Sequence, residues 1–336
     1  MRLLRTLLAH QLKSNKPKVN HGGFTLIELL VAMIVAVLII APLLRFMITI
    51  VDTDRKEQAK ATSEQEIQAA MDYIVRDLEQ AVYIYDNSGV ERDNAGKPDD
   101  SGIRNQIPPV AAAPGCNTDN CKPVLVFWKR KHFDRDDTVG GKTIGTLTND
   151  NDTFVYALVA YYLITEEKDN WSNIARIGRF EIHDKVIDET SNQPNAVGIP
   201  ASPGFKSLDI TNTRGSSLKQ KLNQWEKEDA AYTTPVQILV DYIDNTADNT
   251  ATAITPDCPS VFPKSDDKDD LQVPSQLNGG FYACVDADKR IAQLFLRGNA
   301  LARLKNNPKD YEYKPERSSY FPTVTMQIEG RGFLND

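Results

Sequence analysis

An apolar run from Phe24 to Leu44 constrains this chain more than any other feature. At about 1.5 Å of rise per residue, a helix over these 21 residues is close to the ~30 Å hydrocarbon thickness of a bilayer. Glu28 is the only charged residue in the run. An acidic residue deep in a bilayer costs about 2.5 to 3.5 kcal/mol even on the gentler scales, so such residues usually have a partner. We therefore predict a membrane-spanning helix whose glutamate pairs with a cation.

The segment before the run, residues 1–23, is basic and contains no Asp or Glu. Its basic residues are Arg2, Arg5, Lys13, Lys16 and Lys18. By the positive-inside rule this leader stays in the cytoplasm and the rest of the chain faces outward. An ordinary secretory signal has a shorter apolar core followed by small residues at its cleavage site. Here the small residues Gly22 and Gly23 precede the apolar run, so a cut there would leave the hydrophobic helix on the mature protein.

The residues from Gly23 to Leu30 read Gly-Phe-Thr-Leu-Ile-Glu-Leu-Leu and resemble the prepilin signal of type IV pilins and pseudopilins. The resemblance implies that a membrane-embedded prepilin peptidase cuts after Gly23 and methylates the new amino terminus, Phe24. It also implies that Glu28 pairs with the terminal amine of a neighbouring subunit as a filament grows on an inner-membrane assembly platform. An arriving cation removes much of the cost of a buried carboxylate, which agrees with that role. The alternative is a single-pass anchor whose glutamate is incidental.

Apolar residues continue at helical spacing beyond the membrane run. They recur every three or four residues at Ile67, Met71, Ile74, Leu78 and Val82. The opposite face is charged, and no Gly or Pro occurs from Leu43 to Tyr85. The pattern predicts one helix of about 60 residues from Phe24, with a kink at Pro42. Residues 24–44 would form its transmembrane half, and residues 45–85 its amphipathic continuation.

Runs of β-branched and aromatic residues bounded by turn residues predict strands in residues 86–336. The runs are Val124–Lys131, Phe154–Thr165, Ile174–His183, Val236–Ile243, Gly280–Val285, Arg290–Arg297 and Tyr320–Glu329. A short helix is expected at Ser216–Asp229. We therefore predict an α+β fold in which the long amino-terminal helix packs on an antiparallel sheet. This arrangement resembles the pilin fold. Residues 86–336 would form one extracytoplasmic head with long polar loops.

The charge balance is that of an acidic exported head. Removing the leader takes five of the 39 Lys and Arg residues, so 34 basic residues remain against 46 acidic ones, a net charge of −12. Non-specific binding of nucleic acid draws most of its affinity from Lys and Arg. The composition therefore argues against a nucleic-acid partner.

All four cysteines lie in the predicted head. Cys116 and Cys121 flank a short loop, and Cys258 and Cys284 bracket the start of a predicted strand, so local pairing would give two disulfides in an oxidising compartment. Four cysteines allow three connectivities, and free buried cysteines are a further alternative. A zinc site would want closely spaced cysteine pairs or nearby histidines, which the sequence lacks.

Acidic clusters in the loops raise calcium as a ligand. The clusters are Asp134, Asp136 and Asp137; Asp241, Asp244 and Asp248; and Asp266, Asp267, Asp269 and Asp270. Carboxylate oxygens suit calcium, but no segment has the spacing of a twelve-residue EF-hand loop. Acidic runs in loops are usually solvated, so we predict no cofactor and keep calcium as the alternative.

Signals of enzymatic activity are nearly absent from the sequence. After removal of the leader only His132 and His183 remain, and neither lies in a Gly-x-Ser-x-Gly or His-Glu-x-x-His motif. Gly140 to Thr143 ends like a phosphate loop, but Asp136 stands where that motif requires glycine. We therefore predict a protein that is not an enzyme.

The size of the mature chain favours a minor subunit. Removing 23 of 336 residues leaves 313, and heads this large pack poorly at every step of a thin filament, so we expect a position near the tip. Tyr161–Ile164 with Ile174–Arg176 resembles the minor branch that includes the J-type pseudopilin of type II secretion. Arg290–Arg303 resembles pseudopilins of hormogonium polysaccharide secretion in filamentous cyanobacteria. These likenesses imply secretion; the alternatives are a minor pilin for motility or adhesion and a membrane-anchored binding module outside any filament.

Overall fold

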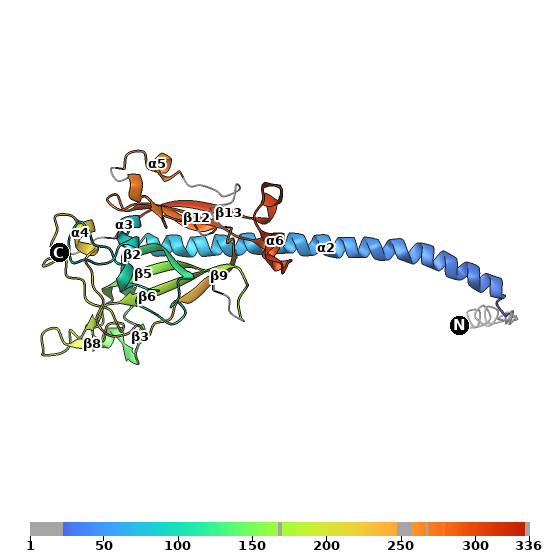
Figure 1. The fold of residues 1–336 in the computed structure, drawn as a ribbon. Helices are drawn as coiled ribbons and strands as arrows, with labels where there is room; N and C mark the ends of the chain where they lie inside the picture. Colours follow the sequence, from blue (N-terminus) through green and yellow to red (C-terminus); the bar gives the residue numbers. More distant parts are fainter. Residues whose placement is uncertain (1–22, 167–169, 247–256, 266–267, 278, 333–336) are drawn as a thin grey trace, which may run out of the picture. The chain divides into compact units, whose positions relative to one another are not determined.

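The computed structural model describes residues 23–166, 170–246, 257–265, 268–277 and 279–332 (Figure 1). The chain divides into two compact units, one ending at Arg55 and the other beginning at Lys56. Helix α2 (Leu26–Leu78) contributes residues to both units. Residues 1–22, which contain the basic leader, lie outside the described part of the chain.

The part of α2 in the first unit exposes its apolar side chains. Large hydrophobic residues from Phe24 to Val51 are exposed, and Leu26 is 86% accessible. The helix continues without interruption through Pro42. It is long and apolar enough to cross a membrane. An exposed and mostly apolar surface of this kind suits lipid or other apolar helices rather than water.

The second unit contains a five-stranded antiparallel sheet in the order β1-β2-β5-β6-β9. Its strands are β1 (Ala81–Ile84), β2 (Cys121–Phe133), β5 (Thr153–Ile164), β6 (Ala175–His183) and β9 (Gln237–Ile243). Side chains alternate between the two faces of each strand. Lys129, Tyr161 and Arg179 face α2, where they contact Asp77. On the other face, the Trp128 ring lies 5.4 Å from the Trp225 ring of a long loop, so loop aromatics cover that side.

A second antiparallel sheet has the order β10-β11-β12-β13. Its strands are β10 (Gln272–Val273), β11 (Phe281–Asp286), β12 (Ile291–Arg297) and β13 (Thr323–Glu329). Within the second unit, α2 runs between this sheet and the five-stranded one, and all three share one apolar core (Figure 1). After β12 the chain passes very close to the helix, since a Cβ atom at Gly298 would lie 2.8 Å from Ser63 Oγ. Any larger residue there would have to displace side chains of the helix.

The remaining elements are short. Two small hairpins consist of β3 (Thr138–Val139) with β4 (Lys142–Thr143) and β7 (Val186–Ile187) with β8 (Val197–Ile199). The short α-helices are α3 (Asn87–Glu91), α4 (Leu218–Leu222), α5 (Cys258–Val261) and α6 (Pro308–Tyr311). The 3-10 helices are η1 (Arg104–Gln106), η2 (Ile144–Thr146), η3 (Lys268–Asp270), η4 (Ala300–Arg303) and η5 (Pro315–Tyr320).

The structure confirms the predicted α+β fold, in which a long amino-terminal helix is followed by an antiparallel β head. The predicted end of the helix is wrong, because α2 stops at Leu78 rather than continuing through residues 45–85. Residues Ala81–Ile84 instead form β1, which pairs with β2 and buries all four side chains. Val82 is thus buried as predicted, but on a strand.

The helix predicted at Ser216–Asp229 is also wrong in extent, because only Leu218–Leu222 is helical. Ser217 and Gln220 form a capping box at its start. Beyond its end the buried Trp225 lies against Trp128, and its indole N–H donates to the carbonyl oxygen of Lys206 at 2.9 Å. Burial of this large ring competes with continuation of the helix.

Candidate functional site

Gly23 and Phe24 precede the first turn of α2 in a non-helical, exposed segment. The side chain of Phe24 is 86% accessible, and a Cβ atom at Gly23 would meet nothing within 4 Å. The bond that the prepilin-like pattern marks for cleavage is therefore open to an enzyme that needs to reach its backbone.

Thr25 and Glu28 close the amino-terminal end of α2. The backbone N–H and the hydroxyl of Thr25 donate to Glu28 Oε2 at 3.0 and 2.8 Å, and the Glu28 N–H donates to Thr25 Oγ1 at 3.3 Å. This reciprocal pattern is a capping box, which satisfies N–H groups that the first helical turn leaves open. The resemblance to prepilins does not single out Thr25, although Thr-x-x-Glu before an apolar run is the signature of this motif.

The surface next to Glu28 is apolar and slightly hollowed. Ala32 and Ala36 follow Glu28 at one-turn intervals, and Val31 and Val35 lie beside them. Within the described residues, the hydrogen bonds to the Glu28 carboxylate come from Thr25. An ionised carboxylate has about four acceptor sites, so Glu28 keeps the capacity to accept a cation from another molecule.

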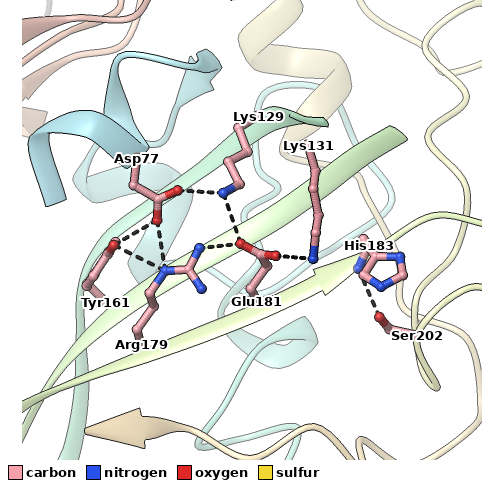
Figure 2. Close-up of polar contacts among 8 residues, drawn as sticks. All are labelled: Asp77, Lys129, Lys131, Tyr161, Arg179, Glu181, His183 and Ser202. Atoms are coloured by element: carbon pink, nitrogen blue, oxygen red, sulfur yellow. Dashed lines mark hydrogen bonds and ion pairs between the residues drawn. The ribbon is translucent and has the colours of Figure 1, made fainter. Parts of the chain in front are cut away.

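A second acidic residue of α2, Asp77, is buried against the five-stranded sheet (Figure 2). Its Oδ1 accepts from Lys129 Nζ at 2.5 Å. Its Oδ2 accepts from the Tyr161 hydroxyl at 2.7 Å and from Arg179 Nε at 2.8 Å. Burial first, and then the Asp77 charge, raise the pKa of Tyr161 well above its ordinary value, so Tyr161 stays a neutral donor.

Glu181 of β6 extends this cluster, which we call the Asp77 network: Asp77, Lys129, Lys131, Tyr161, Arg179 and Glu181 (Figure 2). Glu181 accepts from Lys129 at 2.9 Å and Lys131 at 2.6 Å, and it also pairs with Arg179. Burial disfavours its charged form, but the three cations outweigh burial and lower the pKa of Glu181. The network has three cations and two carboxylates, so each carboxylate is compensated where the helix meets the sheet.

The two histidines of the head lie in different surroundings. His183 follows the Asp77 network along β6 (Figure 2), its Nδ1 lies 2.8 Å from the carbonyl oxygen of Asp184, and burial lowers its pKa. His132 is exposed and lies 3.2 Å from Asp152. The Ser202 hydroxyl beside His183 accepts from the backbone N–H of His183 at 3.0 Å, so this contact engages the main chain and not the imidazole (Figure 2).

The aspartates of the acidic clusters mainly organise their own loops. Asp134 and Asp137 accept from backbone N–H groups of their turn, and Asp244 pairs with Arg297 at 2.5 Å. Among the described residues, no group of three or more His, Cys, Asp or Glu side chains is placed to hold a metal ion. Asp248, Asp266 and Asp267 lie outside that part of the chain.

The cysteines form two disulfides in the head, Cys116–Cys121 and Cys258–Cys284. These are the local pairs among the three connectivities that the sequence allows. The first closes a short loop before β2. The second ties α5 to β11, next to a small apolar cluster that includes Phe262 and Leu271.

Comparison with known proteins identifies the amino-terminal segment. A family model described as the prokaryotic N-terminal methylation motif matches residues 18–44, which include Gly23, Phe24 and Glu28. No curated protein and no solved structure matches the chain. The match covers 27 of the 336 residues and supports an amino-terminal segment similar to the prepilin signal of type IV pilins and pseudopilins.

Proposed function

We propose that this chain is a minor pilin or pseudopilin that is cut after Gly23, methylated at Phe24 and recruited into a filament through Glu28. The observation that carries the proposal is the position of Glu28. Glu28 lies in the matched motif, on an exposed apolar helix. Among the residues that the structure describes, the hydrogen bonds to its carboxylate come from Thr25, which is neutral.

Cleavage after Gly23 would create an ammonium group at Phe24, four residues before Glu28. N-methylation leaves the amine basic, so the group keeps its positive charge. In an apolar environment this charge and the Glu28 carboxylate of a neighbouring subunit attract strongly, and each removes the desolvation penalty of the other. A mismatched register would leave both charges uncompensated, so the pair sets the position of each incoming helix.

The alanines beside Glu28 support close packing of an incoming helix. Small side chains let helix backbones approach each other in a membrane. Ala32 and Ala36 follow Glu28 on one side of α2, so a neighbouring helix could reach the carboxylate without displacing a large side chain.

The large acidic head supports the minor role and a position near the tip, since a tip subunit has no head stacked above it. The basic leader and the apolar helix support insertion with the leader in the cytoplasm and the head in the periplasm. The inner-membrane assembly platform would then extract the subunit into a pilus or pseudopilus. The likeness of Arg290–Arg303 to polysaccharide-secretion pseudopilins supports a secretion filament, with polysaccharide as its cargo.

The mature amino terminus tests this proposal. The chain is purified from membranes of cells with a working prepilin peptidase, and its intact mass and amino-terminal peptide are measured. We expect the loss of residues 1–23 and one methyl group on Phe24. A Gly23→Leu variant is the control, because its side chain should block cleavage while leaving membrane insertion intact. A wild-type chain that keeps its leader in these cells would contradict the proposal.

A further inference from the structure

A groove in the second unit lies between α2 and β9, the edge strand of the five-stranded sheet. Its volume is about 730 Å³, within the range of roughly 300 to 1,000 Å³ that is usual for small-ligand sites. Three aromatic side chains and several polar ones line it. They are Tyr73, Trp171 and Tyr242, with Glu66, Asn170 and Arg303.

Two of these aromatic residues are partly exposed. Trp171 is 41% accessible and Tyr73 is 46% accessible. The other tryptophans, Trp128 and Trp225, are buried in the core. A single exposed aromatic side chain is common, but two that line one groove form an amphipathic surface suited to a partner.

The groove is held in shape by its own contacts. The carboxylate of Asp241 accepts from Ser172 N at 2.8 Å and from Ser172 Oγ at 2.5 Å, which ties the segment carrying Trp171 to β9. Asp241 also accepts from the Tyr242 N–H at 2.8 Å. The Arg303 guanidinium lies 4.0 Å from the centre of the Tyr242 ring and pairs with Glu66 of α2. The binding surface is therefore preorganised.

Tyr242 has a φ of 59°, in the left-handed region that a bulky residue rarely adopts. Such strain costs on the order of 1 to 3 kcal/mol and is concentrated at functional sites. The same irregularity disturbs the edge of β9, whose pairing with β6 already shifts register between Ala175 and Gly178. An irregular edge is a poor template for an added peptide strand.

We propose that this groove binds a neutral oligosaccharide. The C–H faces of a pyranose ring are apolar and pack on aromatic faces, which Trp171 and Tyr73 provide. Sugar hydroxyls both donate and accept, and the amide of Asn170 can do both. The charged residues that line the groove are two carboxylates, Glu66 and Asp241, and one guanidinium, Arg303, which pairs with Glu66. The lining therefore has a formal charge of −1 and disfavours an acidic sugar. The proposal does not depend on how the chain is processed or assembled.

The test uses the full chain in phosphatidylcholine nanodiscs, because maltoside detergents carry competing sugars. The neutral probes are cellotriose, maltotriose and triacetylchitotriose, and the acidic probe is trigalacturonate. Trp171 is the exposed tryptophan, so bound sugar should protect part of the fluorescence from acrylamide quenching. We expect at least one neutral probe to protect at millimolar concentration and trigalacturonate not to protect.

Calorimetric titration of variants then assigns the binding to the groove. Trp171→Ala should weaken binding of the protective sugar about tenfold, since stacking on the ring is lost. Asn170→Ala should weaken it by a smaller factor. Phe154→Ala is the matched control, because it removes an aromatic residue of similar exposure from outside the groove. This variant should bind the protective sugar with the affinity of the wild type. Melting curves show that each variant is folded.

Three outcomes would overturn the proposal. The first is that none of the neutral probes protects Trp171 at millimolar concentration. The second is that a synthetic Thr-Val-Thr-Val-Thr peptide protects Trp171 and the sugars do not, which would assign the groove to an extended strand of another protein. Equal affinities for Trp171→Ala and wild type would place the sugar elsewhere and also contradict the assignment.

Discussion

Two of the acidic residues of helix α2, Asp77 and Glu28, lie in very different surroundings. Asp77 is 7% exposed and is held by two cations and a phenol, all from the five-stranded sheet. Glu28 lies on an exposed apolar surface. Within the described part of the chain, the hydrogen bonds to its carboxylate come from Thr25 of the same turn. Burial of Asp77 is compensated within the folded chain, whereas Glu28 would need an outside cation once apolar surroundings close over it.

The comparison assigns different roles to these two carboxylates of one helix: Asp77 acts in folding of the head, and Glu28 acts in assembly of subunits. An acid that the chain compensates itself contributes to the stability of the head, and its loss should be visible in the isolated subunit. An acid that the chain leaves available contributes nothing to the head, and its loss should be visible only when subunits associate. The predictions below test this separation, beginning with the largest effect on stability.

Replacing Asp77 with alanine should destabilise the head by about 3 to 5 kcal/mol, because Lys129 and Arg179 would lose a buried counter-charge. The measurement is urea unfolding followed by the fluorescence of the buried Trp128 and Trp225. Exposed Glu79, two residues further along the chain in the turn that follows α2, is the matched control, and Glu79→Ala should change stability by less than about 0.5 kcal/mol. Similar effects for both variants would mean that the Asp77 network does not stabilise the head.

The two disulfides should differ in their contribution to the head. Cys258–Cys284 closes 26 residues and Cys116–Cys121 closes five, so loop entropy predicts about 3.5 and about 2 kcal/mol. Serine pairs at each site, compared by urea unfolding, measure the difference. Processing after Gly23 should be unchanged in both, and a processing defect would show that the head and the signal segment are coupled.

Low pH should reduce the free energy of unfolding of the head, because Glu181 becomes protonated. The folded pKa of Glu181 is lowered, so its contribution is fully present above the unfolded value of about 4.3 and is lost as the pH falls through the folded value. Stability should therefore fall by on the order of 2 kcal/mol below about pH 4. Glu181→Gln should flatten this part of the pH profile in urea unfolding. A profile identical to that of the wild type would exclude Glu181 as the titrating group.

Replacing Thr25 with valine should have the smallest effect, because it removes the helix cap and leaves the Glu28 charge in place. Loss of an amino-terminal cap costs about 1 kcal/mol, which corresponds to about fivefold faster hydrogen exchange at the first-turn amides. The head should unfold at the wild-type urea concentration. Unchanged exchange at Leu26 to Glu28 would mean that the capping box does not hold this end of α2.

Periodic features of the fold could be predicted from the sequence, because their signals are local. The spacing of Ile67, Met71, Ile74 and Leu78 predicts the buried face of α2, and all four are buried. The strand β1 was not predictable in the same way. Its short apolar sequence is compatible with helical spacing, and no Gly or Pro marks where α2 ends.

The signal segment, the Asp77 network and the groove also differ in how far the sequence predicts them. Gly23, Phe24 and Glu28 form a contiguous pattern, so the sequence alone points to them. The partners of Asp77 are 52, 84 and 102 residues away, and nothing in the spacing links them. The sugar-binding groove combines segments of α2, the loop before β6, β9 and η4, so its composition emerges only when the chain folds.

The most direct test of the central claim is the recovery of a Glu28→Gln chain in filaments, relative to the amount inserted in the membrane. Glutamine can keep the capping box but removes the charge, so the variant separates capping from ion pairing. Loss of a buried ion-pair partner costs about 3 kcal/mol or more, so we predict recovery about a hundredfold below wild type, with unchanged insertion and head stability. Recovery at the wild-type level would contradict the claim that Glu28 recruits the subunit.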